Sequence, residues 1–398
     1  WKEFTYNNDG TVASTRTYIG YTYYTYDAFG RQISETRPDT VTLNTSFTWN
    51  SSNGGLYAIT KSGTNIPAET TIYDALNREV RQQQTRFDGN QIKVDKAYDT
   101  YGNLWKESYP YKTGNPTYIQ YSYDSNNRLE EKSEIGKTTT YSYNGLQTTV
   151  NDGTMSTTTT TDALGGVVSV TDPAGTISYT LNGAGNPTSI SAPASSDGGI
   201  TTTITYDTYG RRASISDPSS GTTTYSYHGT EGYLQSETNA KNDTTSYVCD
   251  IYGRTTQKST LEFYTTYTYD NYLNKITVET SSNGTSASYT YDALGRLSSI
   301  RENAVDSKWL QKDYTYSGGQ VSAIKYTSQN GVLTTENYYY TNGHLTSVKL
   351  NGTTPIFSIT SENNQGRIAY MGTGGISRNY SYTISGYPIS RTVTAFGP

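Results

Sequence analysis

The side chains that most often carry enzyme chemistry are scarce in this sequence. His228 and His344 are the only histidines, and Cys249 is the only cysteine. A catalytic site needs an acid, base or nucleophile tuned by its neighbours, and a zinc site needs clustered Cys and His. Both histidines fall where turns are expected, and Cys249 stands where other copies of a repeat have Tyr. The sequence therefore predicts no enzyme activity, no metal site and no cofactor.

Aspartate is the acidic residue that recurs most regularly along the chain. The recurring positions, spaced by about 22 residues or a multiple of it, are Asp27, Asp74, Asp99, Asp124, Asp162, Asp207, Asp250, Asp270 and Asp292. Calcium-binding β-rolls also repeat Asp, but their period is about nine residues and they add flanking glycines. The longer period favours another role, in which each carboxylate caps a tight turn.

Most of these aspartates belong to a motif, Tyr-Asp-x-x-Gly/Asn-Arg. Complete, near and weak copies follow one another in phase from Tyr6 to Tyr382, eighteen in all, with a mean period of about 22 residues. The defining residues are Tyr26, Asp27, Gly30 and Arg31; Tyr73, Asp74 and Arg78; Tyr98, Asp99 and Gly102; Tyr123, Asp124 and Arg128; Tyr206, Asp207, Gly210 and Arg211; Asp250, Gly253 and Arg254; Tyr269 and Asp270; and Tyr291, Asp292, Gly295 and Arg296. A repeat of this length and persistence indicates a repetitive architecture.

The motif and its flanks predict a β-hairpin. Before the motif, Tyr alternates with Thr and Ser, as in Thr222–Tyr227, and a period of two places the rings on one face of a strand. Asp-x-x-Gly suits a type I turn in which Asp accepts backbone N–H groups and Gly adopts a left-handed conformation. Asn77 and Asn127 replace Gly, and Asn tolerates that conformation next best. We expect the final Arg to reach back to the turn Asp or to a neighbouring carbonyl.

The composition supports an all-β fold without a large aliphatic core. Hydrophobic residues make up 32% of the chain, and the 41 tyrosines are about a third of them. Tyr and Thr both favour strands. We predict one continuous repeat region over residues 1–398, with about 18 hairpins and 36 strands and no separate catalytic or plug domain. At about 4.8 Å per strand the sheet would be on the order of 170 Å wide, so we expect twist to coil it into a hollow single-layer wall held by stacked Tyr rings.

Charge and hydropathy exclude several classes of protein. The 30 Lys and Arg are balanced by 35 Asp and Glu and are spread evenly, so no basic stripe is present for a nucleic acid. No apolar run approaches the roughly 20 residues that span a bilayer. A single cysteine permits no internal disulfide. Because the chain starts at Trp1 without a leader segment, we interpret it as an internal piece of a longer protein.

The repeated Tyr-Asp-x-x-Gly-Arg copies make the chain resemble the Rhs or YD-repeat family along essentially its whole length. That family includes bacterial polymorphic toxins, the shell subunits of insecticidal toxin complexes, wall-associated bacterial proteins and teneurins. The resemblance implies a hollow shell made by a spiralling ribbon of β-hairpins, which in toxin members encloses a C-terminal effector. It also implies a plug and an effector in the same polypeptide as partners, and a secreted or cell-surface location. We expect a bacterial source.

Toxin members also carry an Asp-Pro- and Gly-rich core segment that plugs the shell and cuts off the effector, and this sequence has none. Its Asp172-Pro173 and Asp217-Pro218 pairs lie within repeats and are interpreted as turns, so self-cleavage is not predicted. Two functions stay open on the sequence. One is a non-enzymatic shell that encloses or carries a polypeptide such as a C-terminal toxin. The other is an extracellular adhesion module whose Tyr-rich surfaces bind glycans or a cell-surface partner.

Overall fold

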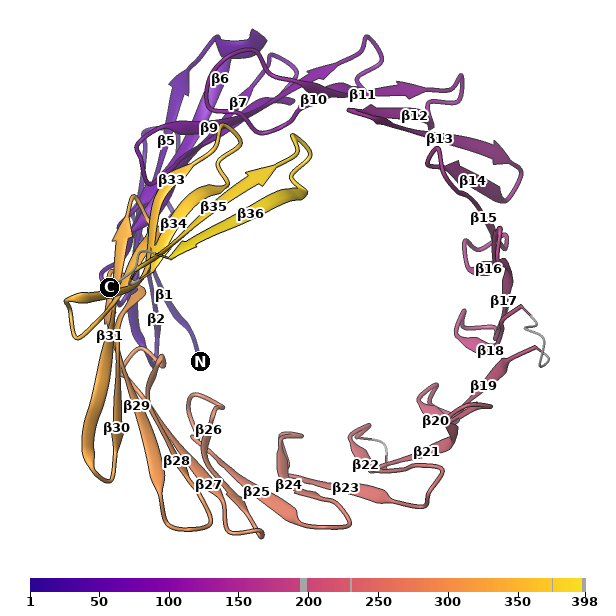
Figure 1. The fold of residues 1–398 in the computed structure, drawn as a ribbon, viewed down its shortest axis with the longest axis vertical. Helices are drawn as coiled ribbons and strands as arrows, with labels where there is room; N and C mark the ends of the chain where they lie inside the picture. The colour runs from indigo at the N-terminus through magenta and orange to yellow at the C-terminus, as the bar shows by residue number, and fades with distance from the viewer. Residues whose placement is uncertain (194–198, 230, 374, 396–398) are drawn as a thin grey trace. The chain divides into compact units, whose positions relative to one another are not determined.

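The computed structural model describes residues 1–193, 199–229, 231–373 and 375–395. In these residues 36 strands form one antiparallel sheet, and the only helical segment is a single 3-10 turn, η1, at Ser52–Gly54 (Figure 1). The described residues contain no helix that is long and apolar enough to cross a membrane. The predicted all-β fold and the predicted number of strands are confirmed.

The strands follow the sequence in order. The first twelve are β1 (Glu3–Tyr6), β2 (Val12–Thr17), β3 (Gly20–Tyr26), β4 (Gln32–Thr36), β5 (Thr42–Trp49), β6 (Tyr57–Gly63), β7 (Ile66–Tyr73), β8 (Glu79–Thr85), β9 (Gln91–Tyr98), β10 (Leu104–Ser108), β11 (Tyr118–Tyr123) and β12 (Leu129–Glu134). The next twelve are β13 (Lys137–Asn144), β14 (Gln147–Asn151), β15 (Ser156–Thr161), β16 (Val167–Asp172), β17 (Gly175–Leu181), β18 (Pro187–Ser191), β19 (Thr201–Tyr206), β20 (Arg212–Asp217), β21 (Gly221–Tyr227), β22 (Leu234–Thr238), β23 (Thr244–Cys249) and β24 (Thr255–Ser259). The last twelve are β25 (Tyr264–Tyr269), β26 (Ile276–Ser281), β27 (Ser286–Tyr291), β28 (Leu297–Asn303), β29 (Trp309–Ser317), β30 (Gln320–Ser328), β31 (Gly331–Thr341), β32 (His344–Leu350), β33 (Thr354–Glu362), β34 (Ile368–Thr373), β35 (Ile376–Tyr382) and β36 (Pro388–Ala395).

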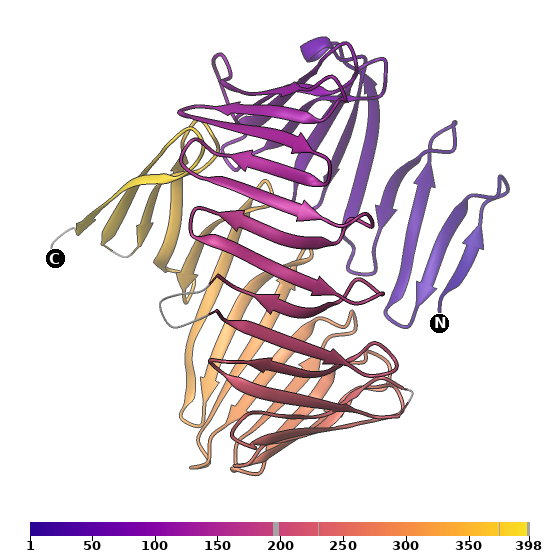
Figure 2. The same ribbon diagram turned by 90° about the vertical axis from the view of Figure 1, so that its right-hand side faces the viewer.

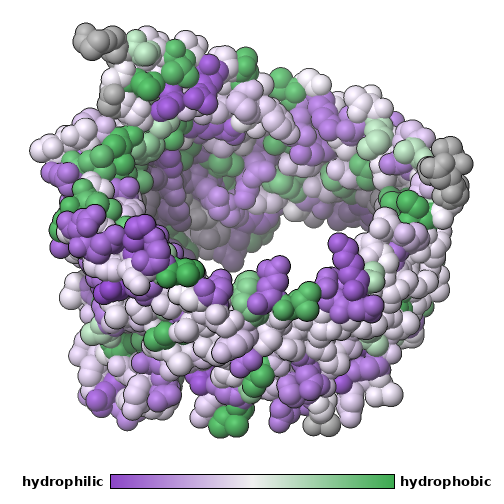
Figure 3. Space-filling model, turned by 60° about the horizontal axis from the view of Figure 1, so that its bottom comes forward, coloured by the Kyte–Doolittle hydropathy of each residue, from purple (hydrophilic) through white to green (hydrophobic). Residues whose placement is uncertain are grey.

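The strands show the two-faced pattern that their sequences predict. In β21, Tyr225 and Tyr227 are half-buried, whereas Thr222, Thr224 and Ser226 on the other face are exposed. Burial also alternates along the seven residues of β3, but its Tyr side chains occupy both faces: Tyr21 and Tyr23 are exposed, and Tyr24 and Tyr26 are half-buried. Because successive side chains of a strand point to opposite faces, a period of two in the sequence becomes two different surfaces on one sheet. Figure 3 shows the result on the visible face of the molecule, where hydrophilic and hydrophobic residues are interspersed.

Most hairpins contain an irregularity at the Tyr of the motif that the sequence does not reveal. Thr25 pairs with Ser34, but the next residue, Tyr26, pairs with Gln32, so one extra residue stands in the outgoing strand. The same shift occurs at Tyr206, Tyr269 and Tyr316, among others. An extra residue of this kind is a β-bulge, and bulges increase the local twist of a strand pair. The repeat therefore adds twist at nearly regular intervals along the sheet.

The described chain divides into two compact units. The first comprises Trp1–Gln120, Asp270–Asn274 and Ala287–Pro398, and the second comprises Tyr121–Tyr269 and Lys275–Ser286. The second unit is a run of hairpins in which each strand lies beside the next, as the magenta strands of Figure 2 show. The first unit is built in the same way and also brings together segments that are far apart in sequence.

Among the described residues, buried apolar side chains are few, and the first unit holds the cluster that three of them form. Ala58, Ile72 and Val80 are almost fully buried and pack against Tyr98. Beside this cluster, on β9, lies a buried carboxylate. Asp95 is 3% exposed and accepts hydrogen bonds from Arg81 Nε at 2.5 Å and Nη2 at 2.8 Å, and from the Tyr111 hydroxyl at 2.7 Å. An ionised carboxylate can be buried because these donors satisfy it.

We expect Asp95→Asn to lower the free energy of unfolding by about 3 kcal/mol, because it leaves the Arg81 guanidinium without its counter-charge in a largely buried place. Urea unfolding followed by circular dichroism measures this difference. The matched control is Asp306→Asn, which breaks an ion pair to Lys308 whose two side chains are 55% and 70% exposed. That change is expected to cost much less, because an exposed ion pair contributes little to stability. Equal effects of the two substitutions would show that the buried pair does not stabilise the sheet.

Candidate functional site

The repeated motif forms the same hydrogen-bonded turn in each complete copy. In the first copy, Asp27 Oδ1 accepts the backbone N–H groups of Phe29 at 2.9 Å and Arg31 at 3.0 Å, and Oδ2 accepts Arg31 Nε at 2.7 Å. Gly30 closes the turn with a φ of 75°. The same bonds are made by Asp74, Asp124, Asp207, Asp250 and Asp292. Each carboxylate is thus occupied by its own turn.

The variant copies retain the turn with other partners. Asn77 and Asn127 take the left-handed position with φ values of 62° and 65°, and Gly102, Gly210, Gly253 and Gly295 do so in their copies. Asp99 bonds to Asn103 where other copies have Arg. Asp270 accepts the amides of Tyr272 and Leu273. The geometry therefore tolerates loss of Arg as long as Asp and the left-handed residue remain.

The turn lowers the pKa of its aspartate. In Asp124 the amide of Arg128, and then its guanidinium, donate to the carboxylate and hold the pKa below the ordinary value of 3.8. Partial burial is the largest single influence at the other complete copies and acts in the opposite direction, but the amide and guanidinium donors together lower the pKa there too. These residues are Asp27, Asp74, Asp207, Asp250 and Asp292. The hydrogen bonds of these turns therefore favour the ionised form of the carboxylate.

In five of these turns the Arg also contacts the aromatic ring of the next copy. The guanidinium lies over a ring that opens the following motif, with these distances from its carbon to the ring centroid: Arg78 to Tyr98, 4.7 Å; Arg128 to Tyr143, 4.2 Å; Arg211 to Tyr227, 4.5 Å; Arg254 to Tyr269, 4.7 Å; Arg296 to Tyr316, 4.3 Å. Such cation–π contacts contribute about 0.5–1 kcal/mol each at exposed sites. One side chain thus closes its own hairpin and joins it to the next one.

The hydroxyl of the same Tyr completes the link between consecutive copies. Tyr269 donates to the carbonyl of Thr255 at 2.7 Å, and Tyr143 donates to the carbonyl of Leu129 at 2.9 Å. In both cases the acceptor is the residue directly after the Arg of the preceding motif. The predicted stacking of Tyr on Tyr is present at some positions. Stacked pairs occur, as between Tyr57 and Tyr73 at 5.1 Å, but the recurring partner of the motif ring is Arg.

A second arrangement of charged residues lies where two distant segments of the first unit meet, and we call it the seam. It consists of Arg86, Asp88, Lys112, Asn342, His344, Glu362 and Asn364. Figure 1 shows β33, which ends at Glu362, beside β9, which follows Arg86. Glu362 is the centre of the seam, because its oxygens contact Arg86 Nη2 at 2.6 Å and Lys112 Nζ at 3.2 Å. Its side chain is only 3% exposed.

Lys112 joins the central carboxylate of the seam to a second one. Its ammonium contacts Asp88 Oδ2 at 2.7 Å. Burial opposes the charged form of Asp88, but Lys112 and Asn90 donate to it and lower its pKa to about 2. Two cations and two carboxylates therefore alternate across the seam, so their charges balance. A balanced and hydrogen-bonded set of this kind can be buried, whereas loss of one member leaves an unpaired charge.

Neutral groups extend the seam on both sides of the ion pairs. The carbonyl of Asn364 accepts the N–H of Lys112 at 2.8 Å, and its side-chain oxygen accepts the N–H of Thr113 at 3.0 Å. Asn342 donates its amide to the carbonyl of Arg86 at 3.0 Å, and His344 Nε2 donates to the carbonyl of Thr85 at 2.9 Å. The seam therefore joins two sets of turns. One set consists of motif turns within residues 340–367, and the other of connecting turns within residues 85–113.

The remaining residues that sequence analysis considered for chemistry lie apart from one another. Cys249 is half-buried at a bulge, in the slot of the motif Tyr. His228 lies in a turn, and its buried Nε2 has no hydrogen-bond partner among the described residues. The carboxylates of Asp172 and Asp217 cap connecting turns. Over residues 1–193, 199–229, 231–373 and 375–395 no three His, Cys, Asp or Glu side chains form a group able to hold a metal.

Comparison with known families identifies the repeat. Residues 154–265 match the family model described as the teneurin YD-shell. This match supports the resemblance to the Rhs/YD-repeat family that the repeated motif indicates. The YD-repeat turns continue on both sides of the matched segment with the same hydrogen bonds. Among curated proteins no sequence matches this YD-repeat chain.

Two solved structures resemble this YD-repeat chain along nearly its whole length. The crystal structure of TcdB2-TccC3-Cdc42 is similar over 100% of the chain, with a TM-score of 0.57 and 15% identity. The pore form of the Photorhabdus luminescens Tc holotoxin, with a TccC3 variant, is similar over 99%, with a TM-score of 0.58 and 16% identity. The likeness spans only 27% and 23% of those chains, and at such identities it shows the fold.

Acid should destabilise this protein through its motif turns. The pKa of these carboxylates is lower in the folded chain than the unfolded value of 3.8. The ionised carboxylates therefore stabilise the fold above pH 3.8, and this contribution is lost as the pH falls through 3.8 toward the folded pKa. We expect the midpoint of thermal unfolding to be steady near neutral pH and to fall steeply below about pH 4. In Asp124→Asn the fall should be shallower, because one of the six carboxylates is gone. A midpoint that stays level down to pH 2.5 would contradict this role.

Removal of the central carboxylate should open the seam without unfolding the hairpins. In Glu362→Ala, Arg86 and Lys112 lose their buried partner, and we expect the Lys112 amide, which donates across the seam, to exchange with solvent about 10- to 100-fold faster. Hydrogen exchange resolved by NMR or mass spectrometry measures this rate. The control is Glu302→Ala, because Glu302 pairs with Lys312 outside the seam and is 55% exposed. An unchanged Lys112 amide in Glu362→Ala would show that the ion pairs do not hold the seam.

Proposed function

We propose that this YD-repeat chain is a non-enzymatic wall segment of a shell that encloses or carries a polypeptide, such as a toxin domain from the C-terminal part of the same protein. The observation that carries the proposal is the seam. Hairpins more than 250 residues apart in sequence are fastened together by a buried, charge-balanced cluster. A strip that only has to extend, such as a stalk, has no need of contacts between distant repeats.

The fold likeness supports the same function. Both similar structures are toxin complexes, and the chain resembles them over 99–100% of its own length. The proposal includes one continuous repeat region over residues 1–398 that coils into a hollow single-layer wall. Regular bulges favour such coiling because they add twist at nearly every hairpin. The partners would be the plug and effector of the same polypeptide, and the location would be secreted or at the cell surface.

The proposal assigns no catalysis to this segment. In the six turns that end in Arg, the aspartate uses both carboxylate oxygens within its own turn. Their lowered pKa keeps them ionised near neutral pH, which does not suit a general acid. A bacterial source belongs to the proposal through the resemblance to toxin members.

Small-angle scattering and electron microscopy of the full chain test the shell. A compact protein of this length would have a radius of gyration of about 21 Å. We expect a clearly larger value, together with images of a curved wall around a solvent-filled space some tens of ångströms across. A solid rod or a compact particle would contradict the shell and would favour a stalk or an adhesin. Specific binding on a glycan array, with no cavity in the images, would favour the adhesion alternative.

A further inference from the structure

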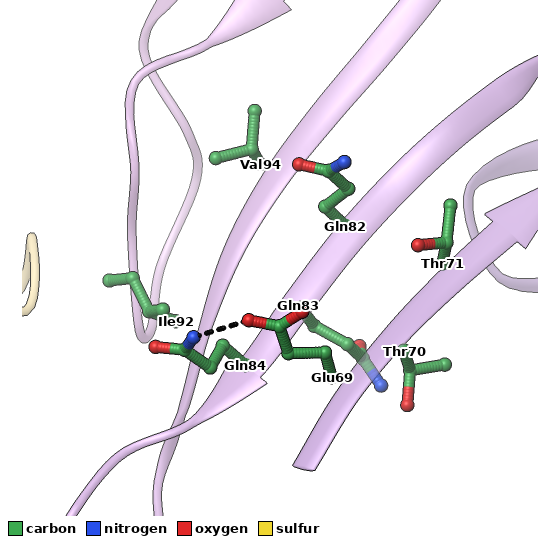
Figure 4. Close-up of a pocket in the computed structure, with 8 residues that line it drawn as sticks. All are labelled: Glu69, Thr70, Thr71, Gln82, Gln83, Gln84, Ile92 and Val94. Carbon is green, nitrogen blue, oxygen red and sulfur yellow. Dashed lines mark hydrogen bonds between the residues drawn. The ribbon is translucent and has the colours of Figure 1, made fainter. Parts of the chain in front are cut away.

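One face of strands β5–β9 carries two hollows that the seam and the motif turns do not use. The first, which we call the aromatic hollow, has a volume of about 670 Å³ and is lined mainly by Phe29, Phe47, Trp49, Leu56, Tyr57 and Ile59. The second, the amide hollow, has a volume of about 240 Å³ and is lined mainly by Glu69, Thr71, Gln82, Gln84, Ile92 and Val94 (Figure 4). Both lie entirely within the first unit.

Strand register places both hollows on the same face of the sheet. Phe47 pairs with Ile59, Ile59 with Thr71, Thr71 with Gln82, and Gln82 with Val94. Residues directly opposite one another in neighbouring strands share a face. The five side chains therefore form one row across the strands, from the aromatic hollow to the amide hollow. With about 4.8 Å between strands the row is about 19 Å long, the length of about six residues of extended polypeptide.

The aromatic hollow is unusual for this chain, which has only 7 Phe and 4 Trp among 398 residues. Two of these Phe and one of these Trp converge on it. Phe29 is 84% exposed and Trp49 is 82% exposed, so the described residues leave it open to solvent. Its volume lies within the range of pockets that hold small ligands or single side chains. An open site where Phe and Trp gather, in a chain with few of these two residues, points to a binding role.

Two polar side chains of the aromatic hollow, Arg31 and Tyr57, already have partners. Arg31 donates to Asp27 and lies over the Phe47 ring at 4.0 Å, and the Tyr57 hydroxyl donates to Asn77. A sugar needs free hydrogen-bonding groups beside an aromatic platform, because its hydroxyls must exchange water for other partners. An aromatic or aliphatic side chain needs none. The chemistry of the aromatic hollow therefore fits an apolar side chain better than a glycan.

The amide hollow has the complementary chemistry. Figure 4 shows the Gln82 side chain in the hollow beside Val94, and Gln82 is exposed at the centre of β8. Nearby, Gln84 donates to Glu69 at 2.7 Å. A carboxamide carries both a donor and an acceptor, as a peptide group does. Such a surface can hydrogen-bond a backbone that passes over it.

We propose that this face of β5–β9 binds an extended polypeptide segment that carries a large apolar side chain. That side chain enters the aromatic hollow, and the backbone beside it crosses β6 and β7 to reach Thr71 and Gln82. The inference rests on the proposed function, since it names the contact through which the wall would hold an unfolded cargo. The contact is short and shallow, and it selects only one side chain of the bound segment. Segments of many different sequences can therefore bind.

Fluorescence anisotropy with a labelled peptide tests the site on the full chain. The probe is a blocked heptapeptide of Gly and Ser with a single Trp, and a second peptide has Ala in place of Trp. We expect the Trp peptide to bind at least tenfold more tightly than the Ala peptide. Trp49→Ala and Phe29→Ala should each weaken its binding about tenfold or more, and Gln82→Ala should weaken it about threefold. Both aromatic residues are more than four-fifths exposed, so these variants should fold.

The matched control is Trp105→Ala, because Trp105 is 47% exposed on β10 and lies outside both hollows. It should leave peptide binding unchanged. Equal binding of the Trp peptide to the native chain, Trp49→Ala and Trp105→Ala would overturn the inference, as would its displacement by maltopentaose at similar concentration. If the Trp peptide does not bind through Trp49 but scattering shows a hollow particle, the binding site is refuted and the shell is not. A solid particle that still binds through Trp49 would refute the shell alone.

Discussion

The structure depends on how the carboxylate of the motif Asp is hydrogen-bonded. The motif Asp accepts two amides and a guanidinium within five residues, so each turn closes with local partners only. The same guanidinium then contacts the ring of the next motif, whose hydroxyl bonds back to the preceding copy. Five copies make both links. The sheet is therefore held largely by nearest-neighbour contacts and needs no continuous apolar core.

That mode of construction explains the composition of the chain. Fully buried apolar side chains are rare, and the cluster around Ile72 is small. Stability comes from ladders of hydrogen bonds, Arg–aromatic contacts and a few buried ion pairs such as Arg81 with Asp95. Both faces of a single sheet then remain available for contacts with other molecules. The seam is the exception, because there the protein buries charges between segments that are remote in sequence.

The seam and the face of β5–β9 support the two parts of the proposed function, a closed wall and contact with a carried polypeptide. A wall must be fastened where distant repeats meet, and polar groups do this without an apolar surface that would aggregate before closure. A wall that carries a polypeptide also needs weak contacts with it, and the aromatic hollow supplies one anchor that the chain itself leaves open.

The sequence by itself determined what depends on neighbouring residues. The number of strands, the two faces of each strand and the roles of Asp27 and Asn77 in their turns follow from a period of two and from the preferences of six residues at a time. Only the tertiary structure decided the rest. The bulge at Tyr26, the ring beneath Arg128, and the meeting of Arg86 with Glu362 depend on how strands pair and on twist accumulated over many hairpins. Arg86 and Glu362 are ordinary charged residues in sequence, and no local pattern marks them as partners.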